Sequence, residues 1–300
     1  MDFGKVDVKE LDTIDFRLPT DRSETAATLK KKPLGKTQKV KVYVGCAKWG
    51  RKEWVGKIYP KGTKDANFLD EYAKHFSAIE FNAMFYRIFP KATIEGWAKR
   101  VGKEFVFCPK FTQEITHFKR LNGAEKVTDQ FLDAISSFGK TLGPCFLQLS
   151  DNFGPKNIEV LESYLKSLPK DLEVFVEVRN KEWYAPENSK LLFEILSKNK
   201  FGAVITDAAG RRDCVHMALT TPKAFIRFVG NSLHPSDYAR VDDWVKRIKK
   251  WIDAGIHEVY FFMHQHDEKY SPELAAYTIK KLNKVCGLEI PEPKFINDKG

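Results

Sequence analysis

Charged side chains stand at the ends of several short apolar runs of this sequence. Three are carboxylates and three are cations, and the two kinds alternate along the chain as Glu80, Lys110, Glu177, Arg179, Asp207 and Arg227. Lysine and arginine orient anionic groups, and a carboxylate beside them can transfer a proton. The set predicts an acid–base site for an anionic substrate, phosphorylated or carboxylated. We expect the three carboxylates to be catalytic and the three cations to bind the substrate.

Other polar and aromatic residues near the ends of the runs complete the candidate site. His117 follows the run that ends at Lys110, and we expect it to shuttle protons from a mobile loop. The remaining expected substrate-binding residues are Lys48, Trp49, Asn82, Tyr86, Gln148, Trp183, His264 and His266. The competing interpretation is a buried salt-bridge network that only plugs one end of the fold. A functional site predicts that Glu177→Gln and Arg227→Ala fold but lose the ligand, whereas a structural network predicts that both unfold.

The elements that must position these residues are strands alternating with helices. The apolar runs are Val42–Cys46, Ala78–Asn82, Phe105–Lys110, Cys145–Leu149, Val174–Val178, Ala203–Thr206, Ala224–Phe228 and Val259–Met263. Their starts lie 21 to 40 residues apart, which leaves room for helical crossovers and is too long for hairpins. Eight such units predict an α/β fold, a (β/α)8 TIM-type barrel whose site forms at the carboxyl ends of the strands. A doubly wound sheet would carry a G-x-G-x-x-G loop after its first strand, and the residues from Gly45 to Gly50 do not match it.

Composition and length are those of a globular chain. The 300 residues are 43% hydrophobic and 30% charged, which excludes collagen-like and disordered classes. We expect no membrane span, because no apolar window approaches the required length of about 18 residues. A secretory pattern is absent from the first residues, so a cytoplasmic location is predicted. Five cysteines without a CxxC pair predict reduced thiols packed as small hydrophobic groups.

Three segments are predicted along the chain. Residues 1–40 are expected to form an irregular basic extension, residues 41–287 the single barrel domain, and residues 288–300 a carboxyl-terminal tail. Part of the net charge of +10 comes from the cluster of lysines just before the barrel. The rest is spread over helix surfaces. A diffuse surplus of positive charge is more typical of a soluble surface than of a nucleic-acid-binding one, and nucleic acid stays an alternative partner. The oligomeric state is not predicted.

From about Lys41 to Cys286 the chain resembles the YecE-like family, domain of unknown function 72. The matching signatures are Gly45-x-x-x-Trp49, Trp54 with Tyr59-Pro60, Ile79-Glu80-Phe81-Asn82, Phe85-Tyr86, Trp97, Phe105-x-Phe107-x-x-Lys110, Thr116-His117, Leu147-Gln148-Leu149, Phe153, Val176-Glu177-Val178-Arg179 with Trp183, Asp207, Ile226-Arg227 and Tyr238. The resemblance implies a TIM-type barrel with these residues grouped at one mouth, and it implies no activity. This chain departs from the family pattern at Cys46-Ala47, at Val229-Gly230 and at Phe262–His266, so a serine or threonine nucleophile after the first strand is not expected.

Several functions remain open on the sequence. The favoured one is an enzyme, a hydrolase or a lyase, that uses carboxylate acid–base chemistry on an anionic substrate. A glycosidase-like hydrolase would use two of the carboxylates with aromatic side chains stacked on sugar rings. Nucleic-acid binding or a metal-dependent phosphodiesterase would use the cations, and a non-catalytic barrel would only hold an anion or a protein. A divalent metal at His264 and His266 is not favoured, because cationic neighbours would repel it.

Overall fold

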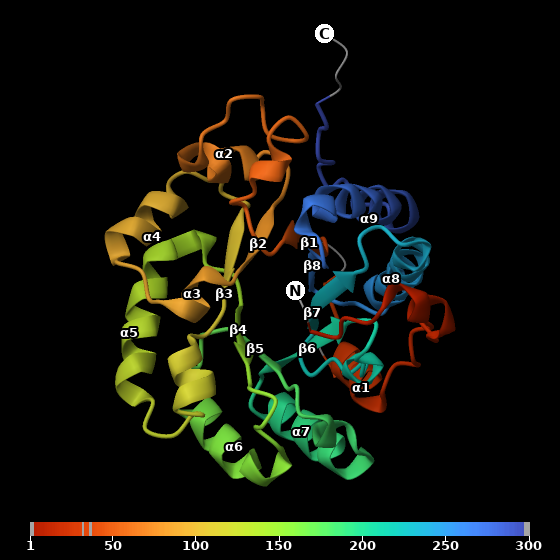
Figure 1. Cartoon of the computed structure of the whole chain (residues 1–300). Coiled ribbons are helices and arrows are strands. Elements are labelled where there is room, and N and C mark those ends of the chain that lie inside the picture. The colour runs from red at the N-terminus through yellow and green to blue at the C-terminus, as the bar shows by residue number, and fades with distance from the viewer. Residues whose placement is uncertain (1–2, 32, 36–37, 297–300) are drawn as a thin grey trace.

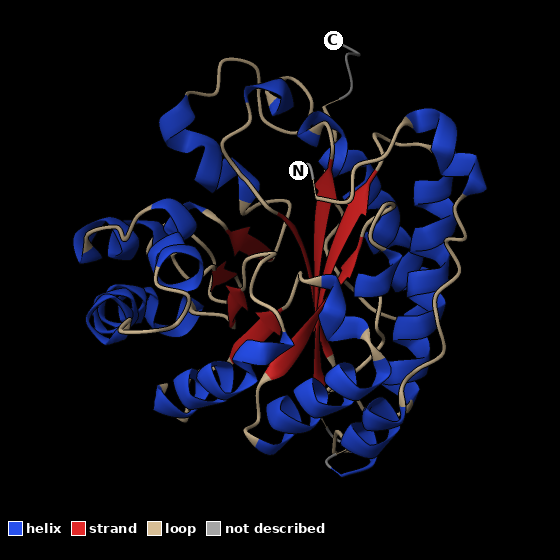
Figure 2. Cartoon of the chain, turned by 60° about the horizontal axis from the view of Figure 1, so that its bottom comes forward, coloured by secondary structure: helices blue, strands red, loops and turns tan. Residues whose placement is uncertain are grey.

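The computed structural model describes residues 3–31, 33–35 and 38–296. It contains one eight-stranded parallel sheet in the order β3-β2-β1-β8-β7-β6-β5-β4. The strands are β1 (Lys41–Cys46), β2 (Ala78–Phe81), β3 (Val106–Pro109), β4 (Cys145–Gln148), β5 (Val174–Glu177), β6 (Gly202–Asp207), β7 (Lys223–Gly230) and β8 (Glu258–Gln265). Their carboxyl ends surround one opening, with helices outside them (Figure 1, Figure 2). All eight predicted runs are strands, and the predicted barrel is confirmed.

The barrel closes between its two edge strands by single bridges instead of a full ladder. Phe107 pairs with Leu142 and Lys110 with Phe146, both in parallel register. The backbone N–H of Phe111 also donates to the carbonyl oxygen of Phe146 over 3.1 Å. By comparison, β7 and β8 share an uninterrupted register from Lys223 opposite Glu258 to Gly230 opposite Gln265.

Helices connect successive strands and pack around the sheet. They are α1 (Ser23–Lys31), α2 (Phe68–Tyr72), α3 (Ala83–Tyr86), α4 (Lys91–Ala98), α5 (Glu125–Ile135), α6 (Ile158–Ser167), α7 (Pro186–Lys198), α8 (Pro235–Asp253) and α9 (Ser271–Cys286). Short 3-10 turns occupy Val8–Thr13, Lys52–Trp54, Asp65–Asn67, Ser136–Thr141, Pro155–Asn157, Lys181–Tyr184, Arg212–Cys214 and Glu268–Tyr270, and a π turn occupies Glu114–Phe118. None of the helices described here is both long and apolar enough to cross a membrane.

Local sequence signals explain where the last helix begins and ends. The helix begins at Ser271, and Pro272 suits its first turn because proline lacks the N–H that a first turn leaves unpaired. The helix ends before Gly287, whose φ of 66° is left-handed and costs glycine little. Between these points Leu274, Ile279 and Leu282 are buried against the sheet.

The amino-terminal segment is more regular than the sequence predicts. Within residues 1–40, where we expected irregular chain, the structure contains the helix α1 and the turn Val8–Thr13. Thr25 bridges to the barrel, since its hydroxyl donates to Met217 O over 2.7 Å and accepts from Leu219 N over 2.8 Å. Leu29 is buried in the main core. This helix is short, so tertiary contacts and not periodicity stabilise it. Residues 1–2, 32, 36–37 and 297–300 lie outside the described residues.

An aromatic layer fills the floor of the barrel. One core cluster consists of Tyr43, Ala78, Cys108, Phe146, Phe175, Val204, Phe225, Tyr260 and Phe262, all buried and nearly all from the strands. Gly202 makes room for this layer, because a Cβ atom there would lie 2.2 Å from the ring of Phe175. A second, larger cluster lies between the strands and the surrounding helices. All five cysteines are free.

Candidate functional site

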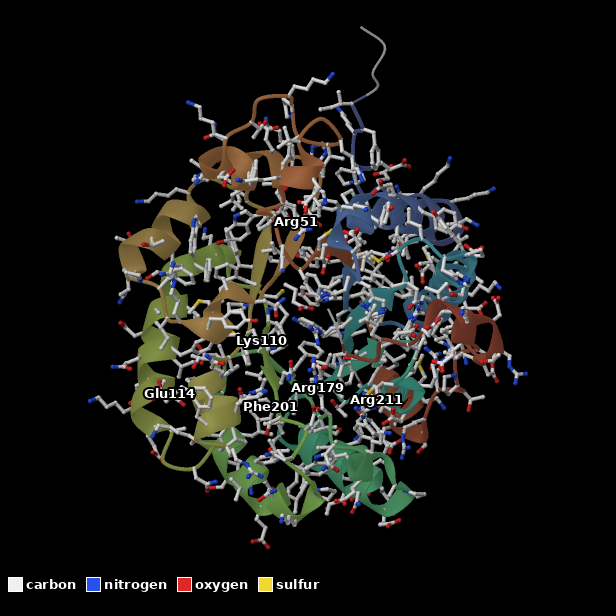
Figure 3. The ribbon with its side chains drawn as sticks, in the orientation of Figure 1. Arg51, Lys110, Glu114, Arg179, Phe201 and Arg211 are labelled. Carbon is white, nitrogen blue, oxygen red and sulfur yellow. The ribbon has the colours of Figure 1, made fainter. Side chains whose placement is uncertain are left out.

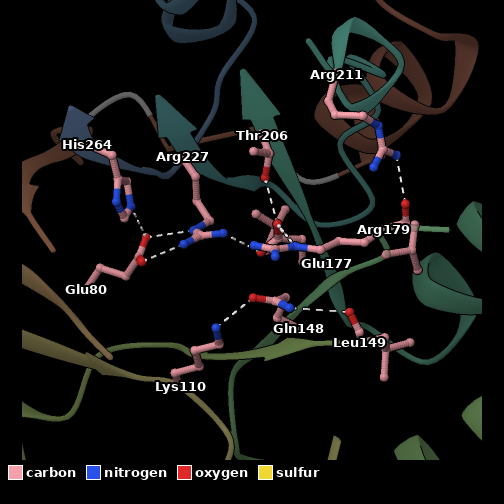
Figure 4. Close-up of polar contacts among 12 residues, drawn as sticks. Glu80, Lys110, Gln148, Leu149, Glu177, Arg179, Thr206, Arg211, Arg227 and His264 are labelled. Carbon is pink, nitrogen blue, oxygen red and sulfur yellow. Dashed lines mark hydrogen bonds and ion pairs between the residues drawn. The ribbon is translucent and has the colours of Figure 1, made fainter. Parts of the chain in front are cut away.

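Strand alternation places a polar layer directly above the aromatic floor. Side chains two residues apart on a strand share a face, so each member of the floor is followed two positions later by another inward position. For seven of the nine members this rule takes Ala78 to Glu80, Cys108 to Lys110, Phe146 to Gln148, Phe175 to Glu177, Val204 to Thr206, Phe225 to Arg227 and Phe262 to His264, whereas Tyr43 leads to Gly45 and Tyr260 to Phe262 of the floor itself. These residues form the cluster drawn in Figure 4. Seven strands therefore contribute to one polar layer at the carboxyl ends.

Arg227 lies at the centre of this layer and bridges two carboxylates. Its Nε and Nη2 donate to Glu80 over 2.8 Å each, and its Nη1 donates to Glu177 over 2.7 Å. All three side chains are buried. Burial is the largest influence and would raise the pKa of both carboxyls, but Arg227 together with the other cations of the layer outweighs it. The pKa of Glu80 therefore lies well below its usual range, and that of Glu177 is also lowered. Both groups stay ionised.

Each carboxylate has further partners that fix its orientation. Asn82 Nδ2 donates to Glu80 Oε1 over 2.7 Å, and Thr206 Oγ1 donates to Glu177 Oε1 over 3.1 Å. Arg179 Nε also donates to Glu177 Oε1, over 3.2 Å. Every carboxylate oxygen of the two acids therefore accepts at least one hydrogen bond, and these bonds fix the two acids and Arg227 relative to one another.

His264 lies between two acids. Its Nε2 is 3.0 Å from Glu80 Oε2, and its Nδ1 is 3.7 Å from Glu268 Oε1. Burial lowers the pKa of this imidazole, but the charge of Glu80 and the bond to Glu268 outweigh burial and raise the pKa above its usual value. The surroundings of His264 therefore favour its charged form. Ser271 in turn donates to Glu268 Oε2 over 2.7 Å.

Lys110 is the titratable group of the layer with the most donors left over. Its Nζ donates to Gln148 Oε1 over 2.6 Å and lies 4.0 Å from the centre of the Phe85 ring. Only 7% of the residue is exposed, and within the described residues Gln148 is the one hydrogen-bond acceptor it contacts. Burial, together with the charges of Arg227 and Arg179, lowers the pKa of Lys110 to about 7.

Arg179 and His117 face the same region from neighbouring elements. Figure 3 labels Lys110 and Arg179 near each other at the centre of the view, and Figure 4 draws both in the same polar cluster. Beyond its Nε bond to Glu177, neither terminal nitrogen of Arg179 donates to any residue of the described chain. His117 contacts the Phe85 ring at 5.0 Å between centroids, and burial and the charges of Lys110 and Arg179 lower its pKa. Donors from Lys110 and Arg179 therefore converge where an anion would enter.

Asp207, predicted to be catalytic, is placed outside this cluster. It follows Thr206 by one residue, so its side chain lies on the opposite face of β6. There it accepts from Arg240 Nη2 over 2.7 Å and from Trp244 Nε1 over 2.6 Å, both on α8, and it also pairs with Arg212. Burial alone would raise its pKa, but Arg240 and Arg212 lower it. The carboxylate joins β6 to α8 and does not reach the mouth.

Trp183, predicted to bind substrate, is also placed elsewhere. Its indole is buried and donates to Phe153 O over 2.7 Å. Trp49 stacks on Phe81 with ring centroids 5.3 Å apart and meets Trp97 edge-on at 5.7 Å. Both indoles thus pack loops against the barrel rim, a common role for aromatic residues after strands.

The remaining predicted residues lie on or near the rim. Lys48 is exposed and His266 is half-buried. Tyr86 is 72% exposed and meets Phe85 edge-on. It lines a cavity of about 630 Å³ with Thr112 and Phe118.

Another cavity, of about 460 Å³, lies at the opposite end of the barrel between the starts of β5, β6 and β7. Four lysines line it, and one of them, Lys223, already pairs with Glu173 and with Glu258. None of the predicted site residues lines this cavity, so we place the candidate site by its converging side chains and not by the size of a hollow. The described residues hold no group of three or more His, Cys, Asp or Glu arranged to bind a metal.

Sequence reasoning missed several residues that shape the cluster. Thr206 donates to Glu177 and Glu268 lies beside His264, and strand alternation alone would have found Thr206. Arg240 on α8 binds Asp207. The charge pattern of the sequence instead predicts that the cations of the helices lie on their solvent-exposed surfaces. Phe3, whose ring lies 4.1 Å from the guanidinium carbon of Arg179, carries no sequence signal because it belongs to a segment without periodicity.

The comparisons with known proteins agree with this architecture. UPF0759 protein YecE of Escherichia coli K12 is 28% identical over 262 residues, which cover 81% of this chain and 93% of that protein. UPF0759 protein YunF of Bacillus subtilis is 28% identical over 153 residues, covering 48% of this chain and 53% of that protein.

Two solved structures share the fold. The DUF72 family protein EF0366 of Enterococcus faecalis V583 has a TM-score of 0.64 at 21% identity, covering 84% of this chain and all 100% of that one. The DUF72 family protein TM1631 of Thermotoga maritima MSB8 has a TM-score of 0.61 at 23% identity, covering 81% and 99%. A sequence model described as "Protein of unknown function DUF72" matches residues 43–295. The chain therefore belongs to the DUF72 family.

Proposed function

We propose that the carboxyl-terminal mouth of the barrel is an active site for a small carboxylated or phosphorylated substrate, bound by Lys110 and Arg179, with Lys110 as the proton-transfer group. The observation that carries this proposal is the environment of Lys110. Only 7% of the residue is exposed, its ammonium has one hydrogen-bond acceptor among the described residues, and the nearby charge of Arg179 contributes to its lowered pKa. A buried cation with donors to spare is costly unless a ligand completes its coordination.

The acid–base role moves from the carboxylates to the lysine for a physical reason. A general acid must hold a proton near neutral pH, and Arg227 keeps both Glu80 and Glu177 ionised. The same argument weighs against a glycosidase, which needs one protonated carboxyl. The two acids and Arg227 instead form the rigid base of the site, and Arg227 is too occupied to act as the anion clamp expected from the sequence.

Lys110 is suited to transferring protons at neutral pH. With its pKa lowered to about 7, about half of the amine is neutral there and can accept a proton from a carbon next to a carbonyl or carboxylate. A bound anion favours the charged form of a neighbouring lysine. Binding of an anion at pH 8 should therefore be accompanied by proton uptake, and the affinity should fall as pH rises above 7.

Calorimetric titration with sulfate tests the binding half of this proposal, because sulfate itself does not titrate between pH 6 and pH 9. We expect proton uptake at pH 8, measured as a difference in heat between two buffers with different ionisation enthalpies. Lys110→Met and Arg179→Gln should each lose binding, whereas Lys126→Met, an exposed lysine on α5, should not. Equal affinity in the wild type and in Lys110→Met would overturn the proposal.

Hydrogen–deuterium exchange tests the catalytic half. A panel of 2-oxo acids and sugar phosphates is incubated in D₂O, and the loss of α-proton signals is followed by proton NMR. We expect at least one compound to exchange with the wild type and not with Lys110→Met. Sulfate binding without any exchange would favour the non-catalytic ligand-binding barrel instead.

A further inference from the structure

The segment of residues 3–31, called here the strap, reaches from the flank of the barrel to the candidate site. In Figure 1 it runs beside α8. The ring of Phe3 covers Arg179 at 4.1 Å and Arg211 at 5.0 Å from their guanidinium carbons. We infer that the strap forms the β5–β6 wall of the site and that Phe3 is a positioning residue for Arg179. This inference rests on the proposed function in taking Arg179 as the anion-binding group.

Backbone contacts fix the position of Phe3. Gly4 O accepts from the N–H of Gly210, which follows β6, over 2.8 Å. Gly4 has a φ of +68°, and a Cβ atom added there would lie 2.6 Å from the Cβ of Ala208. A larger residue at this position would be both strained and sterically excluded. Glycine therefore lets the strap lie close enough to β6 for the Phe3 ring to reach Arg179.

The Phe3 ring contacts the guanidinium of Arg179, and Arg211 binds its backbone. Arg211 donates to the carbonyl oxygen of Arg179 over 2.7 Å and shares the Phe3 ring, while Asp213 neutralises Arg211 at 2.8 Å. An aromatic ring over a guanidinium shields its face from water and leaves the donors in the plane of the group available. The available donors of Arg179 are the two terminal nitrogens, which an anion needs.

The strap is anchored more firmly far from the mouth than close to it. Asp21 pairs with Arg247 over 2.6 Å and with Lys250 over 3.2 Å, and Thr25 and Leu29 are buried. At the mouth Phe3 is only half-buried and depends on its ring contacts and on the backbone bond of Gly4. The Phe3 end can thus be displaced while the rest of the strap stays bound.

The strap precedes the part of the chain that the family model matches, residues 43–295. Arg179 lies inside that part and Phe3 outside it. One wall of the site is therefore supplied from beyond the family domain, and we expect access to Arg179 in this protein to depend on it.

Chemical modification of Arg179 by phenylglyoxal, quantified by peptide mass spectrometry, tests this inference on the full chain. Phe3→Ala and Gly4→Val should each speed modification of Arg179 by between about twofold and about thirtyfold, the range for loss of a cation–π contact. Phe3→Tyr should restore the slow rate, because tyrosine offers the same ring face. Val8→Ala is the matched control, since Val8 belongs to the strap but is 66% exposed.

Two further measurements separate the possible explanations. Arg100, paired with Asp70 at 2.7 Å on the outer surface, should react at one rate in all variants, and the melting temperatures should agree. An Arg179 rate that is the same in wild type, Phe3→Ala and Gly4→Val would overturn the inference. If sulfate slows the modification of Arg179 in none of the proteins, the proposed function is refuted instead. The modification rates measured without sulfate would still decide the role of Phe3.

Discussion

Replacing Lys110 with methionine should stabilise the protein at neutral pH, and the gain should shrink as pH rises. Methionine has nearly the length of lysine and no charge, so it keeps the contact with Phe85 and removes a buried ammonium. The folded pKa of Lys110 is about 7 against 10.5 for the ordinary group. At 1.36 kcal/mol per pKa unit, the charged form costs about 5 kcal/mol in the folded state at low pH, as an upper limit.

The sign follows from proton linkage. Between pH 7 and 10.5 the unfolded chain binds more protons at this lysine than the folded protein does, so the free energy of unfolding of the wild type rises with pH across that window. From pH 7 to 9 this gain is about 2 kcal/mol. Lys110→Met lacks it, and the other titrating groups are common to both proteins. The difference in unfolding free energy between Lys110→Met and the wild type should therefore narrow by about 2 kcal/mol between pH 7 and 9.

Urea unfolding at four pH values between 6 and 9 measures this difference. Tryptophan fluorescence and far-ultraviolet circular dichroism must report the same transition for the free energies to be valid. Lys126→Met serves as the control and should run parallel to the wild type. Parallel curves for Lys110→Met as well would refute the reasoning, because they would show that Lys110 titrates alike in the folded and unfolded chains.

Three other predictions concern residues around the lysine. Asp207→Asn should lower stability by about 3–5 kcal/mol, because it removes the closer of the two carboxylates that neutralise the buried Arg240 and leaves only Asp237 at 3.4 Å, and thermal melts should show the loss while sulfate binding persists. Arg227→Ala should destabilise by at least as much, in contrast to the sequence-based expectation of a folded variant, since two buried acids would face each other; a melting temperature equal to that of the wild type would contradict this. His264 contributes stability that is complete below its unfolded pKa of about 6.5 and is lost as pH rises through its raised folded pKa, so His264→Gln should flatten the pH profile of urea unfolding on the alkaline side of pH 6.5.

The period of the strands accounts for both the success and the failure of the sequence reasoning. Glu80, Lys110, Gln148 and Glu177 were correctly placed together because each ends a parallel strand on its inward face. Asp207 was grouped with them by position along the chain, but it lies one residue beyond the inward Thr206. A single step reverses the face of a strand, so counting from the aromatic floor would have excluded it.

Contacts that depend on tertiary packing were out of reach. Trp183 follows a strand as a ligand-stacking residue would, and only the fold shows its indole bonded to Phe153 O. The ionisation of the acids likewise depends on Arg227 reaching both at once. Phe3 contacts Arg179 across 176 positions of sequence, through a segment whose pattern indicated irregular chain.

The weak pairing that closes the barrel beside Lys110 affects how solvent reaches this residue. Its bridge to Phe146 is one of two isolated pairings that join β3 to β4, whereas β7 and β8 form a continuous ladder. Strand pairs held by few bonds separate at a fraction of the global unfolding free energy. Brief opening of this seam would hydrate the lysine from the side of the wall, so the backbone amide of Phe111, bonded across it, should exchange with solvent faster than amides of the β7–β8 ladder. The seam would then be a second route by which water and protons reach a lysine that is only 7% exposed.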